Sequence, residues 1–343
     1  MSSLPSAAAM PADVRAVEEI MSQGGPRLRE RMLRAELHLE EVAAGAGAPL
    51  AEHATATVVA GGKRLRPLLV LLAAEAAAPA GDERNEQALI RAAVSVELVH
   101  SATLVHDDVI DGASLRRGHP TVDAIAGRAV AVATGDLLFS CAFAELARNG
   151  DAEQLRALSD ASSALARGEL LQREDTYAAD IAVERYLERC RLKTAALFEA
   201  SCRLGALVVG AGSDSLAASL GEFAGRIGLA FQLLDDVLDV SGPAQRTGKA
   251  RGTDLLDGTV TLPLILAREH DAGIAAVDLA SLADPQQAEQ LCERIAATGA
   301  LDEARERALA IVAEAKALLP VALPDGRHEL LALVADAVVE RYC

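Results

Sequence analysis

Two acidic clusters of the same pattern hold the side chains of this sequence that are best suited to chemistry. Both read DDxxD, at 107–111 and 235–239, and each lies in a long apolar stretch. If the stretches are helical, the first and fifth carboxylates of a cluster share one face, where like charges repel. At about 4 Å and an effective dielectric constant near 20, each pair repels by about 4 kcal/mol. Carboxylate oxygens favour Mg²⁺, which usually bridges to substrate phosphates, so the clusters predict a magnesium site for a phosphorylated substrate.

The position of each cluster within its helix strengthens this interpretation. Apolar periodicity predicts helices over about 85–111 and from about residue 215 onwards, so both clusters fall in last turns. The carbonyl end of a helix is already negative, and anionic side chains there need a compensating cation. A solvated helix face is the alternative, but two copies in apolar settings favour a metal site. The clusters are far enough apart in sequence to face each other across a helical bundle.

Basic residues could neutralise a phosphorylated substrate in a chain whose formal net charge is -17. The stretch GGKRLRP at 61–67 opens a predicted helix, where backbone N–H groups, Lys63 and Arg66 could hold a phosphate. A helix cap with solvated charges is the alternative. Arg116 and Arg117 follow the first cluster and indicate diphosphate recognition, unless they only pair with nearby aspartates.

Two histidines precede the first cluster. His100 lies seven residues before it, on about the same helix face, and could donate to a phosphate, whereas His106 is ambiguous. A histidine satisfied in the core or on the surface is the alternative for each. Taken alone, Lys193, Thr194 and Lys249 resemble ordinary surface residues.

Composition predicts an almost entirely α-helical chain. Aromatic residues make up 2%, tryptophan is absent and alanine is abundant, which favours helices over strands. We expect residues 1–12, which are small and proline-containing, to be disordered, and residues 13–343 to form a single all-α domain. The longest predicted loops, 112–121 and 241–258, each follow an acidic cluster. Three glycines of the second predicted helix could allow close helix packing: Gly221, Gly225 and Gly228.

The net charge and the cysteine pattern limit which partners and which cellular compartment are plausible for this protein. A pI of about 4.9 argues against a nucleic-acid partner and against strong attraction to anionic lipid. Five cysteines show no metal-ligand spacing and indicate core thiols in a reducing compartment. We find no run of 18 or more apolar residues and no N-terminal signal pattern, so we expect a cytoplasmic protein.

Taken together, the motifs resemble the trans-isoprenyl diphosphate synthases of the polyprenyl synthetase family, and among them the long-chain bacterial polyprenyl diphosphate synthases. The match runs from about residue 55 to about residue 268, with the motifs in the family's order. They are GGKRLRP (61–67), LVHDDVIDGASLRRGHPT (104–121), GD (135–136), KTAALFEAS (193–201), FQLLDDVLD (231–239) and GKARGTDLLDGTVTLPLI (248–265).

This resemblance implies an isoprenoid synthase-type helical bundle around a deep central cavity, usually a homodimer. It implies a Mg²⁺-dependent condensation of isopentenyl diphosphate with an allylic diphosphate, giving a long-chain all-trans polyprenyl diphosphate, with at most transient membrane contact through that lipid product. The metal ligands would be Asp107, Asp108, Asp111, Asp235 and Asp239. These five would be catalytic together with Asp236, Lys193 and Lys249. Isopentenyl diphosphate would lie against Gly62, Lys63, Arg66, His100 and Arg117, and the allylic diphosphate against Arg116, Lys193, Thr194, Gln232 and Lys249.

Two positions depart from the family's pattern. Many relatives carry a lysine after the Asp-Gly or Glu-Gly of the second loop, whereas this chain continues from Gly258 to the uncharged Thr259. Asp123 stands where relatives often have asparagine or histidine. Both changes bear on diphosphate contacts and leave the core chemistry in place.

Product length is predicted from residues that precede the first cluster on its helix. With the diphosphate fixed at the cluster, the tail runs back along the helix, past Thr103 and Ala102 and then past Leu98 and Val99. The first two are small, which predicts an open tunnel and a product of roughly six to ten isoprene units. Candidates for the tunnel floor, unless they are plain core residues, are Phe139 and Phe143.

Three other functions are compatible with parts of the pattern. A short-chain synthase that makes farnesyl or geranylgeranyl diphosphate would share the same motifs. A terpene cyclase is less favoured, because cyclases usually lack an intact second DDxxD and the GGKRLRP loop. A non-catalytic partner subunit or lipid-diphosphate binding module is the alternative of another class, and such proteins tend to lose one acidic cluster, whereas this chain keeps both.

Overall fold

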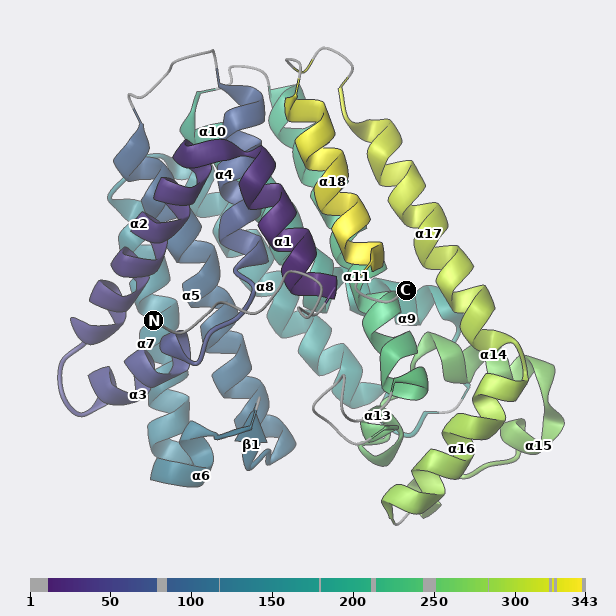
Figure 1. Cartoon of the computed structure of the whole chain (residues 1–343). Coiled ribbons are helices and arrows are strands. Elements are labelled where there is room, and N and C mark those ends of the chain that lie inside the picture. Colours follow the sequence, from purple (N-terminus) through teal and green to yellow (C-terminus); the bar gives the residue numbers. More distant parts are fainter. Residues whose placement is uncertain are drawn as a thin grey trace, which may run out of the picture.

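The alanine- and leucine-rich sequence folds into helices along nearly the whole part of the chain that the computed structural model describes (Figure 1). That part comprises residues 12–78, 85–116, 118–178, 180–210, 214–242, 251–282, 284–320, 323 and 326–340. The prediction of an all-α fold is confirmed. The predicted disorder of residues 1–12 lies outside the described residues, apart from Ala12, which already begins a helix.

The elements follow one another with short connections. They are α1 (Ala12–Gln23), α2 (Gly25–Ala44), α3 (Leu50–Val59), α4 (Leu65–Ala77), α5 (Glu86–Asp111), β1 (Leu115–Arg116), β2 (His119–Pro120), α6 (Val122–Ala126), α7 (Arg128–Ala147), α8 (Ala152–Glu174), α9 (Val183–Cys190), a π-helical turn (Arg191–Ala195), α10 (Ala196–Val208), α11 (Asp214–Ser241), α13 (Thr253–Leu256), α14 (Leu262–His270), α15 (Ala272–Ala275), a 3₁₀ turn (Leu279–Ser281), α16 (Pro285–Ala297), α17 (Ala300–Leu318) and α18 (Arg327–Glu340).

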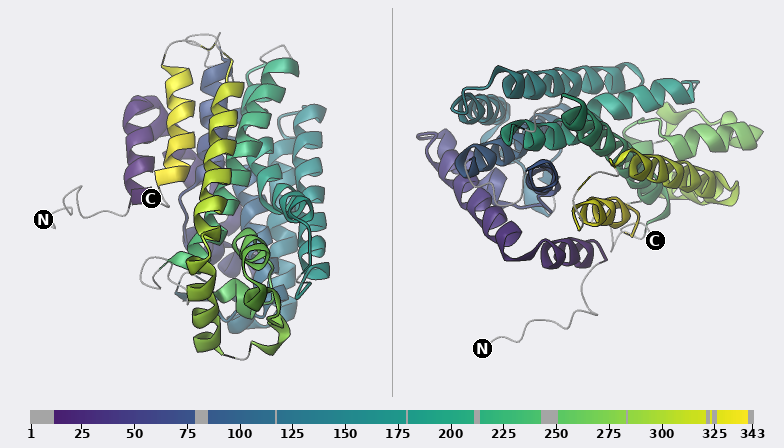
Figure 2. Two further views of the ribbon diagram at one scale, coloured as in Figure 1. Left: turned by 90° about the vertical axis from the view of Figure 1, so that its right-hand side faces the viewer. Right: turned by 90° about the horizontal axis from the view of Figure 1, so that it is seen from above.

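Helices α5 and α11 carry the two acidic clusters in their last turns, as the sequence predicts. Between them in the bundle lies α10, which packs against α4, α5 and α11, while α7 covers another side of α5. Because most of α5 is surrounded in this way, its side chains are buried along almost its whole length. Seen from above, the helices surround the centre of the bundle (Figure 2).

The first and last described helices close the bundle against each other. Figure 1 shows α1 and α18 side by side, and the two helices are in contact. Ile20 of α1 is fully buried, and α18 buries Leu331, Val334 and Val338. Residues near the two ends of the chain therefore share one core.

The basic loop before α4 is held by its own arginine. Arg64 adopts a left-handed conformation (φ 50°) at the N-cap of α4, which is uncommon for a residue other than glycine. Its guanidinium donates to Glu36 at 2.6 Å, to Glu97 at 2.8 Å and to the carbonyl oxygen of Val58 at 2.6 Å. Glu97 is almost fully buried, so Arg64 anchors the loop to α2, α3 and α5 and has a structural task.

A short hairpin follows the first acidic cluster. Gly112, in the left-handed region (φ 61°), ends α5, and its N–H donates to the carbonyl oxygen of Asp108. Strands β1 and β2 then pair antiparallel, with Arg116 opposite His119. The chain thus turns back at once, so that Arg116 returns to the cluster that precedes it.

Two helices pass a test of length and mean hydropathy for membrane spans, although the sequence shows no unbroken apolar run. These are α5, whose most apolar window is 72% buried in the bundle, and α7, whose window is 39% buried. Helix α5 is a core helix, since neighbouring helices cover most of its surface. Helix α7 keeps an exposed and weakly polar outer face.

The cysteines match the prediction of core thiols in the part of the chain that the structure describes. Cys141, Cys190, Cys202 and Cys292 are free, and all but Cys141 are buried. Burial raises the pKa of Cys190 and of Cys292 to about 12, so these thiols stay protonated and unreactive.

Candidate active site

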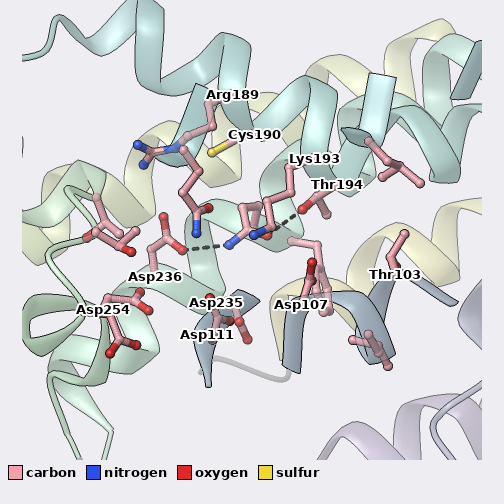
Figure 3. A pocket seen from close by; sticks show the side chains of 18 of the residues that line it. Thr103, Asp107, Asp111, Arg189, Cys190, Lys193, Thr194, Asp235, Asp236 and Asp254 are labelled. Carbon is pink, nitrogen blue, oxygen red and sulfur yellow. Dashed lines mark hydrogen bonds between the residues drawn. The ribbon is translucent and has the colours of Figure 1, made fainter. Parts of the chain in front are cut away.

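Both acidic clusters face the same cavity. The cavity has a volume of about 340 Å³, and its walls come from α5, α8, α9, the π turn and α11. Figure 3 shows aspartates of both clusters in this pocket, with Lys193 and Thr194 beside them. The predicted site residues that line it are Arg66, His100, Thr103, Asp107, Asp111, Lys193, Thr194, Gln232, Asp235 and Asp236.

A second cavity of about 940 Å³ adjoins the first. It is lined by the basic loop with Gly62 and Lys63, by Asp108, and by Arg116 of the hairpin. The residues that line both cavities are Arg66, His100, Leu104, Phe231 and Asp235. Two pockets, one acidic and one framed by the basic loop, therefore meet at a common wall.

The first cluster contains a carboxyl group whose pKa is raised by its surroundings. The pKa of Asp107 is about 6, mainly because the group is buried; Lys193 lowers this pKa, whereas the nearby carboxylates of Glu169 and Asp111 raise it. Asp108 accepts from Nε of Arg116 at 2.6 Å, and Asp111 forms an ion pair with Arg173 of α8. Cations from other elements thus balance part of the charge.

The carboxylates of the second cluster differ in exposure. Asp235 faces both cavities, whereas Asp236 lines only the first and is 4% exposed. Asp236 accepts from Tyr186 at 2.6 Å and from Gln232 at 2.8 Å. Its pKa is raised to about 7, first by burial and then by the nearby carboxylate of Asp254. Asp239 lies one turn on and accepts from the backbone N–H of Asp254 at 3.3 Å.

The donor set fits a divalent cation. Among the residues with described positions, no three carboxylate, histidine or cysteine side chains are already gathered around one point. The aspartates do supply hard oxygen ligands from two walls of one cavity. The pKa of Asp107 is raised mainly because burial disfavours its charged form, and a bound cation would favour that form. Mg²⁺ needs only one or two carboxylates with water and phosphate oxygens, so such facing pairs suit it.

A π-helical turn presents Lys193 and Thr194 to the cavity. π-helical turns are rare and occur often at functional sites. Two glycines make room for this turn: a Cβ on Gly168 of α8 would lie 2.5 Å from the Lys193 nitrogen, and one on Gly228 of α11 would lie 2.9 Å from Cα of Ala195. Close packing at Gly228 agrees with the sequence prediction, whereas Gly168 is a finding of the structure.

Three of the four residues predicted to set the chain length are buried in the core and do not line an open tunnel. Thr103 lines the first cavity, but Ala102, Leu98 and Val99 are each 0% exposed. No water-sized space therefore touches these three, because α5 packs directly against its neighbours there. The expectation of an open tunnel beside Ala102 is not met, and a ruler role for these positions stays a prediction. The floor candidates of α7 are partly buried against the core, Phe139 stacking on His106 and Phe143 packing alongside.

Arg117 and Lys249 lie outside the described residues. The structure adds cavity-lining residues that sequence reasoning missed, among them Gln172 and Arg173 of α8, and Arg189 and Asp254. Gln172, Arg173 and Arg189 carry no signal in their spacing, since they join the site only when α8 and α9 fold onto it. Asp254 lies within the motif at 248–265, which is a signal that could have found it. Thr259, which stands where relatives often have lysine, lines the first cavity as well.

Comparison with known protein families and structures decides the identity. The family model described as polyprenyl synthetase matches residues 48–298. The chain belongs to the polyprenyl synthetase family.

Individual members of the polyprenyl synthetase family show how far the likeness extends. Heptaprenyl diphosphate synthase component 2 of Geobacillus stearothermophilus is 40% identical over 253 residues, 73% of this chain and 77% of the relative. Geranylgeranyl diphosphate synthase of Methanosarcina mazei is 36% identical over 290 residues, 83% of this chain and 87% of the relative. A crystal structure of decaprenyl diphosphate synthase from Rhodobacter capsulatus superposes with a TM-score of 0.85 at 31% identity, covering 95% and 99% of the two chains. As a polyprenyl synthetase, this chain is a trans-prenyltransferase.

One prediction concerns the raised pKa of Asp107. An acid whose pKa is raised by folding makes the fold less stable as pH rises from its unfolded pKa to its folded pKa, here from about 4 to about 6. We expect Asp107→Asn to raise the free energy of unfolding at pH 7.5 by about 1 to 2 kcal/mol in EDTA, to flatten the decline between pH 4 and 6, and to abolish product formation. Urea unfolding at several pH values measures the free energy of unfolding and its pH dependence, and an assay for the prenyl product measures activity. Asp160→Asn, on the exposed face of α8, is the control, and a less stable Asp107→Asn protein would contradict the argument.

A second prediction concerns Gly168 of α8, which packs against the π turn. Gly168→Ala places a methyl group against the backbone of Lys193, so we expect a lower melting temperature and at least about a tenfold loss of activity. The matched control is Gly225→Ala on α11, where a Cβ meets only Glu199 at 3.5 Å or more. That helical substitution should stabilise by about 0.5 to 1 kcal/mol and leave activity intact. Equal behaviour of the two variants would show that the close approach at Gly168 is unimportant.

Proposed function

We propose that this enzyme condenses isopentenyl diphosphate with an allylic diphosphate and makes a long-chain all-trans polyprenyl diphosphate. The observation that carries the proposal is the pair of adjoining cavities with a common wall. The allylic diphosphate belongs in the cavity with both acidic clusters, and isopentenyl diphosphate in the cavity with the basic loop. Each substrate then places its reacting carbons near the shared wall of Leu104 and Phe231.

The proposed cofactor is Mg²⁺, held by Asp107, Asp108 and Asp111 from one wall and by Asp235 and Asp239 from the other. When bound, Mg²⁺ would stabilise the charge of the departing diphosphate as a Lewis acid. Asp236 lies behind this group as a hydrogen-bonded, catalytically important carboxylate.

The side-chain cations are assigned to the two diphosphates. Lys193, Thr194 and Gln232 line the first cavity and contact the allylic diphosphate there. Arg116, which lines the second cavity and donates to Asp108, and Lys249 are further predicted contacts of this diphosphate. Gly62, Lys63, Arg66 and His100 hold isopentenyl diphosphate, with Arg117 as a further predicted contact. The guanidinium of Arg66 is stacked at 4.8 Å over the ring of Phe198, which fixes its direction before substrate arrives.

The proposed reaction requires the protein to position the substrates and stabilise charge, without forming a covalent bond to either substrate. The C–O bond of the allylic diphosphate breaks, the double bond of isopentenyl diphosphate attacks the resulting allylic cation, and a proton leaves to the released diphosphate. Positioned cations stabilise the leaving group, and the apolar wall keeps water from the carbocation.

The long-chain assignment is supported by small Thr103 at the cavity and by the similarity to heptaprenyl and decaprenyl diphosphate synthases. A short-chain product is the second candidate, supported by the closed packing around Ala102 and by the similarity to a geranylgeranyl diphosphate synthase. A cytoplasmic location remains our proposal from the sequence.

Product sizing separates these outcomes. The purified chain is incubated with Mg²⁺, isopentenyl diphosphate and farnesyl or geranylgeranyl diphosphate, and the product is sized after dephosphorylation. We expect a long prenol that disappears with EDTA, and a shorter one from Thr103→Phe, which projects a ring into the cavity. A short prenol from the wild-type protein would leave the chemistry and overturn the length. No product with any primer would favour a non-catalytic partner subunit.

We propose a homodimer that pairs through α7. Apart from Arg128 at its first residue, the exposed positions of this apolar helix follow one face, and all of them are small or apolar except one aspartate: Ala129, Val132, Asp136, Ser140, Ala144 and Ala147. Exposed Ile125 of α6 extends the surface. A partner subunit of another kind is the alternative, suggested by the word "component" in the name of the Geobacillus relative.

Light scattering on the protein that elutes from a size-exclusion column gives its molar mass and so tests the proposed homodimer. A charge at the centre of an apolar interface is costly to bury, so Val132→Arg should shift the protein from dimer to monomer at micromolar concentration. Leu309→Arg, at an exposed position on α17, is the control and should leave the dimer intact. A monomeric wild-type protein, or a dimeric Val132→Arg protein, would overturn the proposal.

A further inference from the structure

A tyrosine outside every predicted motif touches the second acidic cluster from within the bundle. Tyr186 of α9 is 0% exposed, and its hydroxyl donates to Oδ2 of Asp236 at 2.6 Å. The guanidinium of Arg189 lies 5.3 Å from the centre of the tyrosine ring and helps to hold it. Tyr186 is absent from the residues that line the first cavity, whereas Asp236 is among them.

The hydrogen bond from Tyr186 continues through two more side chains. Oδ1 of Asp236 accepts from Nε2 of Gln232 at 2.8 Å. Oε1 of Gln232 in turn accepts from the hydroxyl of Thr194 at 2.7 Å. Three bonds thus connect α9, α11 and the π turn, and they end at two side chains that line the cavity with both acidic clusters.

The chemistry of the partners fixes the direction of each bond. Asp236 accepts at both of its carboxylate oxygens, so Gln232 turns its NH₂ group toward Asp236 and its oxygen toward Thr194. The second N–H of Gln232 is then left for another acceptor, and the proton of the Thr194 hydroxyl points to Gln232. A diphosphate only accepts, so the direction of this amide decides which donors the cavity offers it.

We propose that Tyr186 is a positioning residue for prenyl transfer: by binding Asp236, its hydroxyl fixes the amide of Gln232, so that the second N–H of that amide faces the allylic diphosphate. The inference rests on the proposed function, since it takes the first cavity as the allylic site. Gln232 and Thr194 line that cavity and are not among the residues that line the second. Loss of the tyrosine hydroxyl therefore acts on one substrate more than on the other.

The test compares the two substrates in one variant. Tyr186→Phe removes the hydroxyl and keeps the ring. We expect the KM for the allylic primer to rise about tenfold, the size of effect typical of one lost buried hydrogen bond, while the KM for isopentenyl diphosphate stays within about twofold. Tyr177→Phe, at an exposed tyrosine, is the matched control and should leave both KM values unchanged. Equal changes in the two KM values would indicate a merely structural role and overturn the proposal.

A double-mutant cycle tests the connection along the chain of bonds. If Tyr186 and Thr194 both act by fixing the amide of Gln232, the variant with both Tyr186→Phe and Thr194→Val should be no more than about twofold worse in kcat/KM for the primer than the worse single variant. Losses that multiply would show that the two residues act independently. Should Tyr186→Phe unfold, the cycle is repeated in a Gly225→Ala background, for which we expect higher stability.

The same experiments separate this inference from the proposed function. If the wild-type protein forms no prenyl product, the proposed function is wrong and the tyrosine has no reaction to serve. If the wild-type protein forms product and Tyr186→Phe is indistinguishable from it, only the positioning role is wrong.

Discussion

Repulsion between carboxylates that face one cavity from two helices is the constraint on which the rest of this site depends. Asp107, Asp111 and Asp235 line a common space, where burial raises the pKa of Asp107. The protein balances this charge with cations from other elements, such as Arg116 of the hairpin and Arg173 of α8. The metal–diphosphate complex proposed for this site would exchange one set of ion pairs for another.

Small residues give the helices the distances that this arrangement requires. With so few aromatic rings, the bundle is fixed by backbones in close contact: Gly168 and Gly228 flank the π turn, and a Cβ on Gly205 of α10 would lie 2.1 Å from the Val70 carbonyl oxygen of α4. Backbone contact of this kind leaves little freedom for neighbouring helices to slide. The positions of Lys193 and Thr194 are therefore set by the scaffold and not by their own side chains.

Features with local signals could be predicted from the sequence, and features made by folding could not. Charge clusters in apolar stretches predicted where α5 and α11 end, and the basic loop was placed correctly before α4. Thr103 and Ala102 were treated alike because they are neighbours in sequence, yet one faces the cavity and the other is sealed in the core. Tyr186 and Arg173 had no pattern to mark them, since they meet the clusters only through packing of α8 and α9.

The contact between α1 and α18 bears on how the chain is made. Helix α18 packs against α1 but is synthesised long after it, so this part of the core cannot form until residues 327–340 are available. Contacts between such distant parts of a chain form slowly, because a long loop must close before they stabilise anything. Until α18 folds onto α1, the apolar surfaces that the two helices bury against each other stay exposed and prone to aggregation.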